Sequence, residues 1–196
     1  MRVNEDQFCP IHTGDELASP DFALFYQRWN AARGAARMPN KSCIQAASIP
    51  PHILKQVSII GVENNGRRFV IRLAGSELRE RGQIEMTGRS VGSEASTPAE
   101  LEASPDTLEH LKWCCDNQQP YCVGGAARWS GREMLAQRMI VLPYCGDDGS
   151  VERLLTLTKL DVTDDPCRSC EATHCSDDAS ANTPHPMGPA GNPHLA

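Results

Sequence analysis

Four potential metal ligands lie within nine positions near the end of the chain, namely Cys167, Cys170, His174 and Cys175. Thiolate sulfur and imidazole nitrogen are the ligands that structural zinc sites use, in tetrahedral sets of four. The cluster therefore indicates zinc as a cofactor of this segment. Cys9 and His12 have the spacing C-x-x-H and could complete such a site with Cys167 and Cys170, which would join the two ends of the chain.

The alternative is that these side chains are reduced thiols in a disordered tail. Adjacent ligands such as His174 and Cys175 fit poorly around one ion, and zinc sites usually join two separate elements. The chain has nine cysteines, an odd number that excludes complete intramolecular pairing. Its first residues lack the apolar core of a secretory signal, so we expect a cytoplasmic protein with reduced cysteines.

The remaining reactive side chains form no recognisable catalytic set. The sequence contains no G-x-S-x-G elbow and no phosphate-binding loop, so we expect no enzyme activity and name no catalytic residue. Cys114 and Cys115 are adjacent on an expected helix and must point in different directions. We expect Cys115 in the core and Cys114 partly exposed, where it could act as a thiol switch.

Two alternating segments, 55–63 and 67–75, predict the hairpin around which the other strands pair. Phe69, Ile71 and Leu73 alternate with more polar residues, and an Asn-Gly turn joins the two segments. Segments 121–130, 133–144 and 151–162 predict three more strands, and Ser-Pro-Asp starts at positions 19 and 104 predict two helices. The order favours an α+β domain with a five-stranded antiparallel sheet and its helices on one face.

The first expected helix, residues 19–33, is amphipathic and carries an aromatic stripe: Phe22, Phe25, Tyr26 and Trp29. In one interpretation the stripe packs on the sheet of its own chain. In the other it meets a second copy, because so apolar a stripe must be buried against a protein surface. The second interpretation predicts a homodimer with these four residues in its interface.

Segments spread over about 21–162 resemble the PAS domain, and in particular a PAS-like family of small alphaproteobacterial proteins. The matching segments are Phe25-Tyr26-Gln27-Arg28-Trp29, Gly34, Arg37-Met38-Pro39, the strand from Phe69 to Gly75, Thr87-Gly88-Arg89 and Val151-Glu152-Arg153-Leu154-Leu155. The resemblance implies a sensory or interaction domain in signal transduction. It carries over no catalytic residue.

The resemblance also implies a ligand cavity between the sheet and the helices, with an unknown cofactor. Its lining would come from ten residues: Phe69, Ile71, Leu73, Leu108, Leu111, Leu135, Met139, Val141, Leu155 and Leu157. The same residues could equally fill a core at ordinary packing density. Some PAS domains bind haem through a histidine, which makes His52 and His110 candidates, although each could be a structural histidine. The reactive-cysteine stretch that flavin binding would need is absent.

Charge and composition limit the partners. The net charge is −6, and residues 161–196 carry most of it, with six acids and one base. The nearly neutral remainder argues against nucleic-acid binding, and no apolar run is long enough to span a membrane. We expect a flexible segment 1–18, a PAS-like domain 19–162, and a disordered acidic tail 163–196 that contains prolines and cysteines. The protein would act through self-association, a signalling partner or a small ligand; the alternative is metal or redox sensing by its Cys and His residues.

Overall fold

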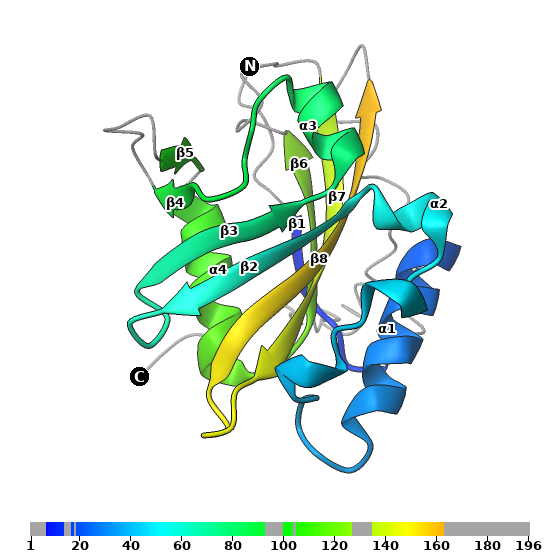
Figure 1. Cartoon of the computed structure of the whole chain (residues 1–196), viewed down its shortest axis with the longest axis vertical. Helices are drawn as coiled ribbons and strands as arrows, with labels where there is room; N and C mark the ends of the chain where they lie inside the picture. The colour runs from blue at the N-terminus through cyan, green and yellow to red at the C-terminus, as the bar shows by residue number, and fades with distance from the viewer. Residues whose placement is uncertain are drawn as a thin grey trace, which may run out of the picture.

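A single eight-stranded sheet runs through the computed structural model (Figure 1), which describes residues 7–13, 17, 19–92, 100–103, 105–126 and 135–162. The acidic tail 163–196, with Cys167, Cys170, His174 and Cys175, lies outside the described residues. In the described part, no helix is long and apolar enough to cross a membrane.

The five expected strands form the centre of this sheet. They are β2 (Val57–Glu63), β3 (Arg68–Ala74), β6 (Tyr121–Ala126), β7 (Leu135–Cys145) and β8 (Val151–Val162). Three short strands extend the sheet at its edges, β1 (Gln7–Pro10), β4 (Ser90–Gly92) and β5 (Glu100–Glu102), giving the order β1-β6-β7-β8-β2-β3-β4-β5. The predicted count of five was therefore too low. The prediction of an antiparallel sheet was also incomplete, because β4 and β5 pair in parallel and make the sheet mixed.

The hairpin of β2 and β3 contains a bulge that the alternating sequence conceals. Ile59 pairs with Leu73 but Ile60 pairs with Ile71, so Arg72 is an extra residue in β3. An extra residue reverses which face the following side chains occupy. Leu73 therefore lies on the opposite face from Ile71 and is 45% exposed, although the sequence predicted one apolar face for both.

Helices cover both faces of the sheet, whereas the sequence predicted them on one face. Neighbouring residues of β8 establish this, because successive side chains of a strand point to opposite faces. Lys159 forms an ion pair with Asp21 on α1 (Pro20–Arg33). Thr158 faces the other way, into a cavity lined by α4 (Pro105–Asn117). Figure 1 shows α1 and α4 on different sides of the strands. We call the two faces of the sheet the α1 face and the α4 face.

Shorter helices complete the connections. The 3-10 helices η1 (Lys41–Cys43) and η2 (Ala46–Ser48) and the short helix α2 (Pro51–Leu54) lead from α1 to β2. The helix α3 (Ser76–Gly82) follows β3 and precedes the two short edge strands. Ile53 of α2 and Leu78 of α3 are buried, so both short helices contribute to the core.

The aromatic stripe of α1 packs on the sheet of its own chain. Phe22, Phe25, Tyr26 and Trp29 are 3–8% exposed, and Trp29 Nε1 donates a hydrogen bond of 2.7 Å to the carbonyl oxygen of Pro143 in β7. One of the two interpretations of the sequence placed these four residues in a dimer interface. Their burial inside one chain instead assigns them to its core, since the sheet already supplies the apolar surface that the stripe needs.

Candidate ligand cavity

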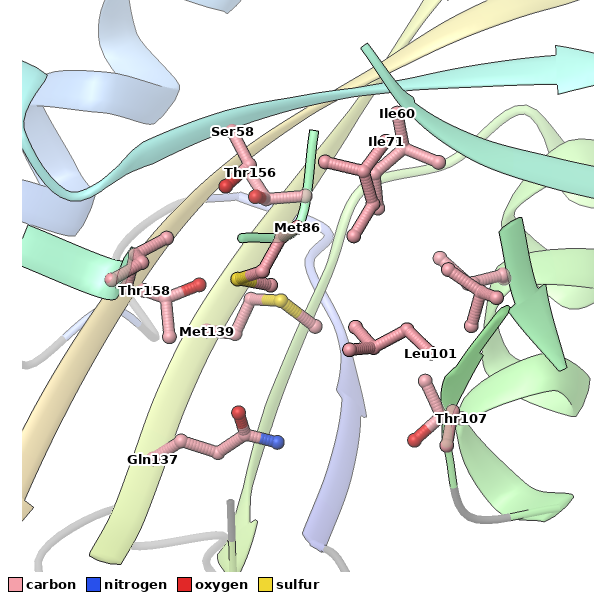
Figure 2. A pocket seen from close by; sticks show the side chains of 14 residues that line it. Ser58, Ile60, Ile71, Met86, Leu101, Thr107, Gln137, Met139, Thr156 and Thr158 are labelled. Carbon is pink, nitrogen blue, oxygen red and sulfur yellow. The ribbon is translucent and has the colours of Figure 1, made fainter. Parts of the chain in front are cut away.

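A cavity of about 80 Å³ lies between the α4 face of the sheet and the segments that cover it. The sheet contributes side chains from β2, β3, β7 and β8 (Figure 2). The helices α3 and α4 and the short strands β4 and β5 close the other side. The residues lining it are Ser58, Ile60, Ile71, Leu78, Met86, Val91, Leu101, Ala103, Thr107, Leu111, Gln137, Met139, Thr156 and Thr158.

Three hydroxyl groups form a polar strip on the floor of this cavity. Ser58 and Thr156 are directly opposite each other on β2 and β8, and Thr158 follows Thr156 on the same face. All three residues are no more than 5% exposed. Figure 2 shows the three side chains projecting from neighbouring strands into the same space. We call Ser58, Thr156 and Thr158 the hydroxyl strip.

The hydroxyl strip lines the cavity, where its oxygens can hydrogen-bond to a bound molecule. A buried hydroxyl that forms no hydrogen bond costs about 1–3 kcal/mol relative to water. Tyr121, in the same cross-strand row on β6, is such a group: its buried hydroxyl lacks a partner among the described residues. Burial raises the pKa of Tyr121 well above its usual range, so this hydroxyl is a neutral donor and acceptor.

The cavity lining contains no charged side chain among the described residues. Desolvating an unpaired ion costs far more than desolvating a neutral polar group, so the lining suits uncharged molecules. Met86 and Met139 lie on its walls, and methionine side chains adapt readily to the shape of what they contact. A cavity needs about 10–15 Å³ measured in this way to hold one water molecule, so this cavity has room for several water molecules or a small ligand.

Three of the ten predicted lining residues do line the cavity: Ile71 on β3, Leu111 on α4 and Met139 on β7. Phe69 and Val141 lie on the α4 face as expected, but both are fully buried in the core beside the cavity. They fill the core, which is the alternative that the sequence left open for the whole set.

The other predicted lining residues lie elsewhere. Leu155 and Leu157 share the face of Lys159 on β8, so they pack beneath α1 rather than α4. Leu73 is displaced by the bulge in β3. Leu108 is partly buried on α4 and packs against the core, and the side chain of Leu135 lies outside the described residues.

The hydroxyl strip was missed because β8 is covered on both faces. The sequence of β8 alternates leucine with threonine and lysine, a pattern that predicts the leucine face as the cavity face. In the structure the leucine face packs under α1 and the threonine face points into the cavity. Leu154 and Leu160 share the threonine face and are buried. Leucines on this face are the sequence signal that it is covered as well.

The histidine candidates for haem do not line the cavity. His52 is exposed and lies 3.4 Å from Asp21, and His110 stacks on Phe8 with 4.4 Å between the ring centres. His12 lies 3.1 Å from the side chain of Gln119, near Cys9. The described residues contain no group of three or more His, Cys, Asp or Glu side chains placed to hold a metal ion, and the predicted zinc ligands of the tail lie outside them.

The adjacent cysteines of α4 occupy the reverse of their predicted positions. Cys114 is fully buried and donates to the carbonyl oxygen of Gln119 at 3.2 Å, whereas Cys115 is partly exposed. Burial raises the pKa of Cys114 well above its usual range and that of Cys115 to about 12. A thiol with a raised pKa is a poor nucleophile, so the geometry argues against a thiol switch at Cys114.

Comparison with known proteins identifies the class. A family profile described as PAS domain matches residues 17–159, most of the chain, so the chain belongs to the PAS domain family. No curated protein matches. Among solved structures the chain is similar to one titled "Structure of an RNA-binding Light-Oxygen-Voltage Receptor", with 11% identity and a TM-score of 0.43. The match covers 84% of this chain and 42% of that one, so the chain spans less than half the length of that receptor.

Proposed function

We propose that this protein is a sensory PAS domain that binds a small uncharged molecule in the cavity above the hydroxyl strip. The strip is the observation that carries this proposal, because it places three buried hydroxyl side chains, Ser58, Thr156 and Thr158, in a lining that is otherwise mostly apolar. A ligand that hydrogen-bonds to these groups gains free energy from those bonds. The absence of charge from the described lining supports an uncharged ligand.

The signal leaves the domain through self-association or a protein partner rather than through a reaction catalysed by this chain. Ligand binding has this effect when it favours one position of the segments that close the cavity. Leu78 of α3 and Leu111 of α4 belong to both the cavity lining and the helices that cover the sheet. A ligand that contacts them therefore shifts the helices that a partner would meet.

Native mass spectrometry of protein purified from cells tests the proposal. We expect a bound species heavier than water that dissociates on unfolding, and that is reduced in a Thr156→Val, Thr158→Val variant. Valine keeps the shape of threonine and removes the hydroxyl. Thr13→Val is the matched control, because Thr13 is exposed and is not among the lining residues.

Two results would contradict the proposal. One is a native mass equal to that of the bare chain. The other is identical thermal unfolding of protein as purified and of protein that has been unfolded, dialysed and refolded. Either result would mean that water alone occupies the cavity.

A further inference from the structure

Two cysteines that are far apart in the sequence lie opposite each other in the sheet. Cys9 on the edge strand β1 and Cys122 on β6 are direct partners in an antiparallel pair. Directly opposite side chains project to the same face, so the two thiols are neighbours. Both residues are partly buried thiols and neither is in a disulfide. The register, rather than any sequence spacing, brings them together.

The hydrogen-bond pattern gives their approximate separation. Ile11 N donates to Pro120 O at 2.9 Å, which makes Ile11 and Pro120 a hydrogen-bonded pair. Pairs alternate along an antiparallel ladder, so Cys9 and Cys122, two positions along, are again a hydrogen-bonded pair with Cα atoms about 5.5 Å apart. This separation lies within the range of about 4.4–6.8 Å found for disulfides.

The Cβ atoms must move closer to form a bond. Opposite residues have Cβ atoms about 4.5–5.5 Å apart, whereas a disulfide needs about 3.5–4.5 Å. Strand β1 can supply this movement, because it has four residues and pairs with β6 alone at the edge of the sheet. A bond that pulls the strands together in this way is strained, and strained disulfides are the easily reduced ones.

We propose that Cys9 and Cys122 are a reversible redox pair that closes when the cell meets a peroxide. One thiol attacks hydrogen peroxide, giving a sulfenic acid and water. The second thiol attacks that sulfur and releases a second water, so two thiols and one peroxide become one disulfide and two waters. A cellular dithiol reverses the step by exchange. Closing the pair does not itself require a ligand in the cavity.

Closing the pair fixes β1 and, through it, the helix α4 that packs against it. Phe8, beside Cys9, stacks on His110 of α4 and contacts the ring of Trp113 at 5.0 Å between centres. The disulfide therefore restrains the strand that anchors α4 on its outer side. Since Leu111 of the same helix lines the cavity, oxidation changes how easily α4 moves away from the sheet.

Peptide mapping of the full chain tests the pair. Reduced protein is treated with one equivalent of hydrogen peroxide, alkylated with iodoacetamide and digested without reductant. We expect a linked peptide that contains Cys9 and Cys122 and disappears after dithiothreitol. Hydrogen exchange of the β1 and β6 amides should slow at least tenfold in the oxidised protein.

The variants Cys9→Ser and Cys122→Ser must each abolish the link, and Cys43→Ser, at an exposed cysteine, must leave it unchanged. The wild-type map alone can overturn the proposal, whether or not a variant folds. It does so if Cys9 and Cys122 are both alkylated after oxidation, or if they link mainly to other cysteines such as Cys167 or Cys170.

Discussion

The indole Nε1 of Trp29 donates a hydrogen bond of 2.7 Å to the carbonyl oxygen of Pro143, across 114 positions of sequence. Both residues are buried, so water does not offer the carbonyl a replacement donor. The bond orients α1 across β7, and the aromatic stripe then meets the apolar residues on the α1 face. This contact holds the aromatic stripe in the core of its own chain.

Replacing Trp29 with phenylalanine should lower the free energy of unfolding by about 1–3 kcal/mol, because it leaves the Pro143 carbonyl without its donor. Replacement with alanine should cost about 3–5 kcal/mol, since a cavity forms as well. Urea unfolding measures both. Gln27→Ala, on the exposed side of α1, should change little. A folded and equally stable Trp29→Ala chain with altered association by light scattering would instead support a dimer interface at the aromatic stripe.

The bulge in β3 predicts opposite sensitivities for two neighbouring apolar residues. Ile71→Ala should cost about 2–5 kcal/mol, as expected for a buried core position. Leu73→Ala should stay within about 0.5 kcal/mol, because its side chain is exposed. Equal losses in urea unfolding would mean that both residues share one buried face, as simple alternation predicts.

Gly75 allows a close approach between two backbones. A Cβ atom at this position would overlap the carbonyl oxygen of Lys55, and a backbone atom has no rotamer that relieves the overlap. Gly75→Ala should therefore lower the free energy of unfolding by more than about 2 kcal/mol. Ser76→Ala, at the exposed next position, is the matched control. A thermal unfolding midpoint unchanged by Gly75→Ala would disprove the close approach.

The ion pair of Asp21 and Lys159 makes part of the stability dependent on pH. The hydrogen bond from Lys159 holds the pKa of Asp21 below its usual value of 3.8, and His52 adds to the effect. A lowered folded-state pKa gives stability that is present above pH 4 and is lost as the pH falls through the folded-state value. Lys159→Met should cost at most about 1 kcal/mol at pH 7 and less at pH 3.

Denaturation at several pH values checks this dependence, with Lys112→Met on the exposed side of α4 as the control. A Lys159→Met penalty that is the same at pH 3 and pH 7 would show that the lysine acts through packing rather than charge.

Local sequence signals predicted the hairpin, the two long helices and the five central strands. Those signals are short-range: alternation, a Ser-Pro-Asp helix start, and the Asn-Asn-Gly turn, whose residues at 64–66 all adopt positive φ. The short strands β1, β4 and β5 were missed because three or four residues are too few to show a period. The pairing of β1 also depends on a strand far away in the sequence, with Val123 opposite Phe8.

Assigning faces failed for a different reason. Alternation shows that two faces differ, but it does not show which covering helix each one meets. On β8, the threonine residues facing the cavity look like a solvent face, and the leucine residues under α1 look like a cavity wall. The bulge at Arg72 adds a second obstacle, because one inserted residue reverses the pattern without any change in composition.

The strand order has a consequence for the growing chain on the ribosome. β8, the last strand in the chain, pairs with β7 on one side and with β2 on the other, so it joins the two halves of the sheet. Until residue 162 has left the exit tunnel, the hairpin of β2 and β3 and the pair of β6 and β7 have no shared neighbour. β1 likewise has no partner until β6, more than a hundred residues further along the chain, has been made. Such delayed pairing exposes open strand edges during synthesis, and exposed edges of this kind favour aggregation.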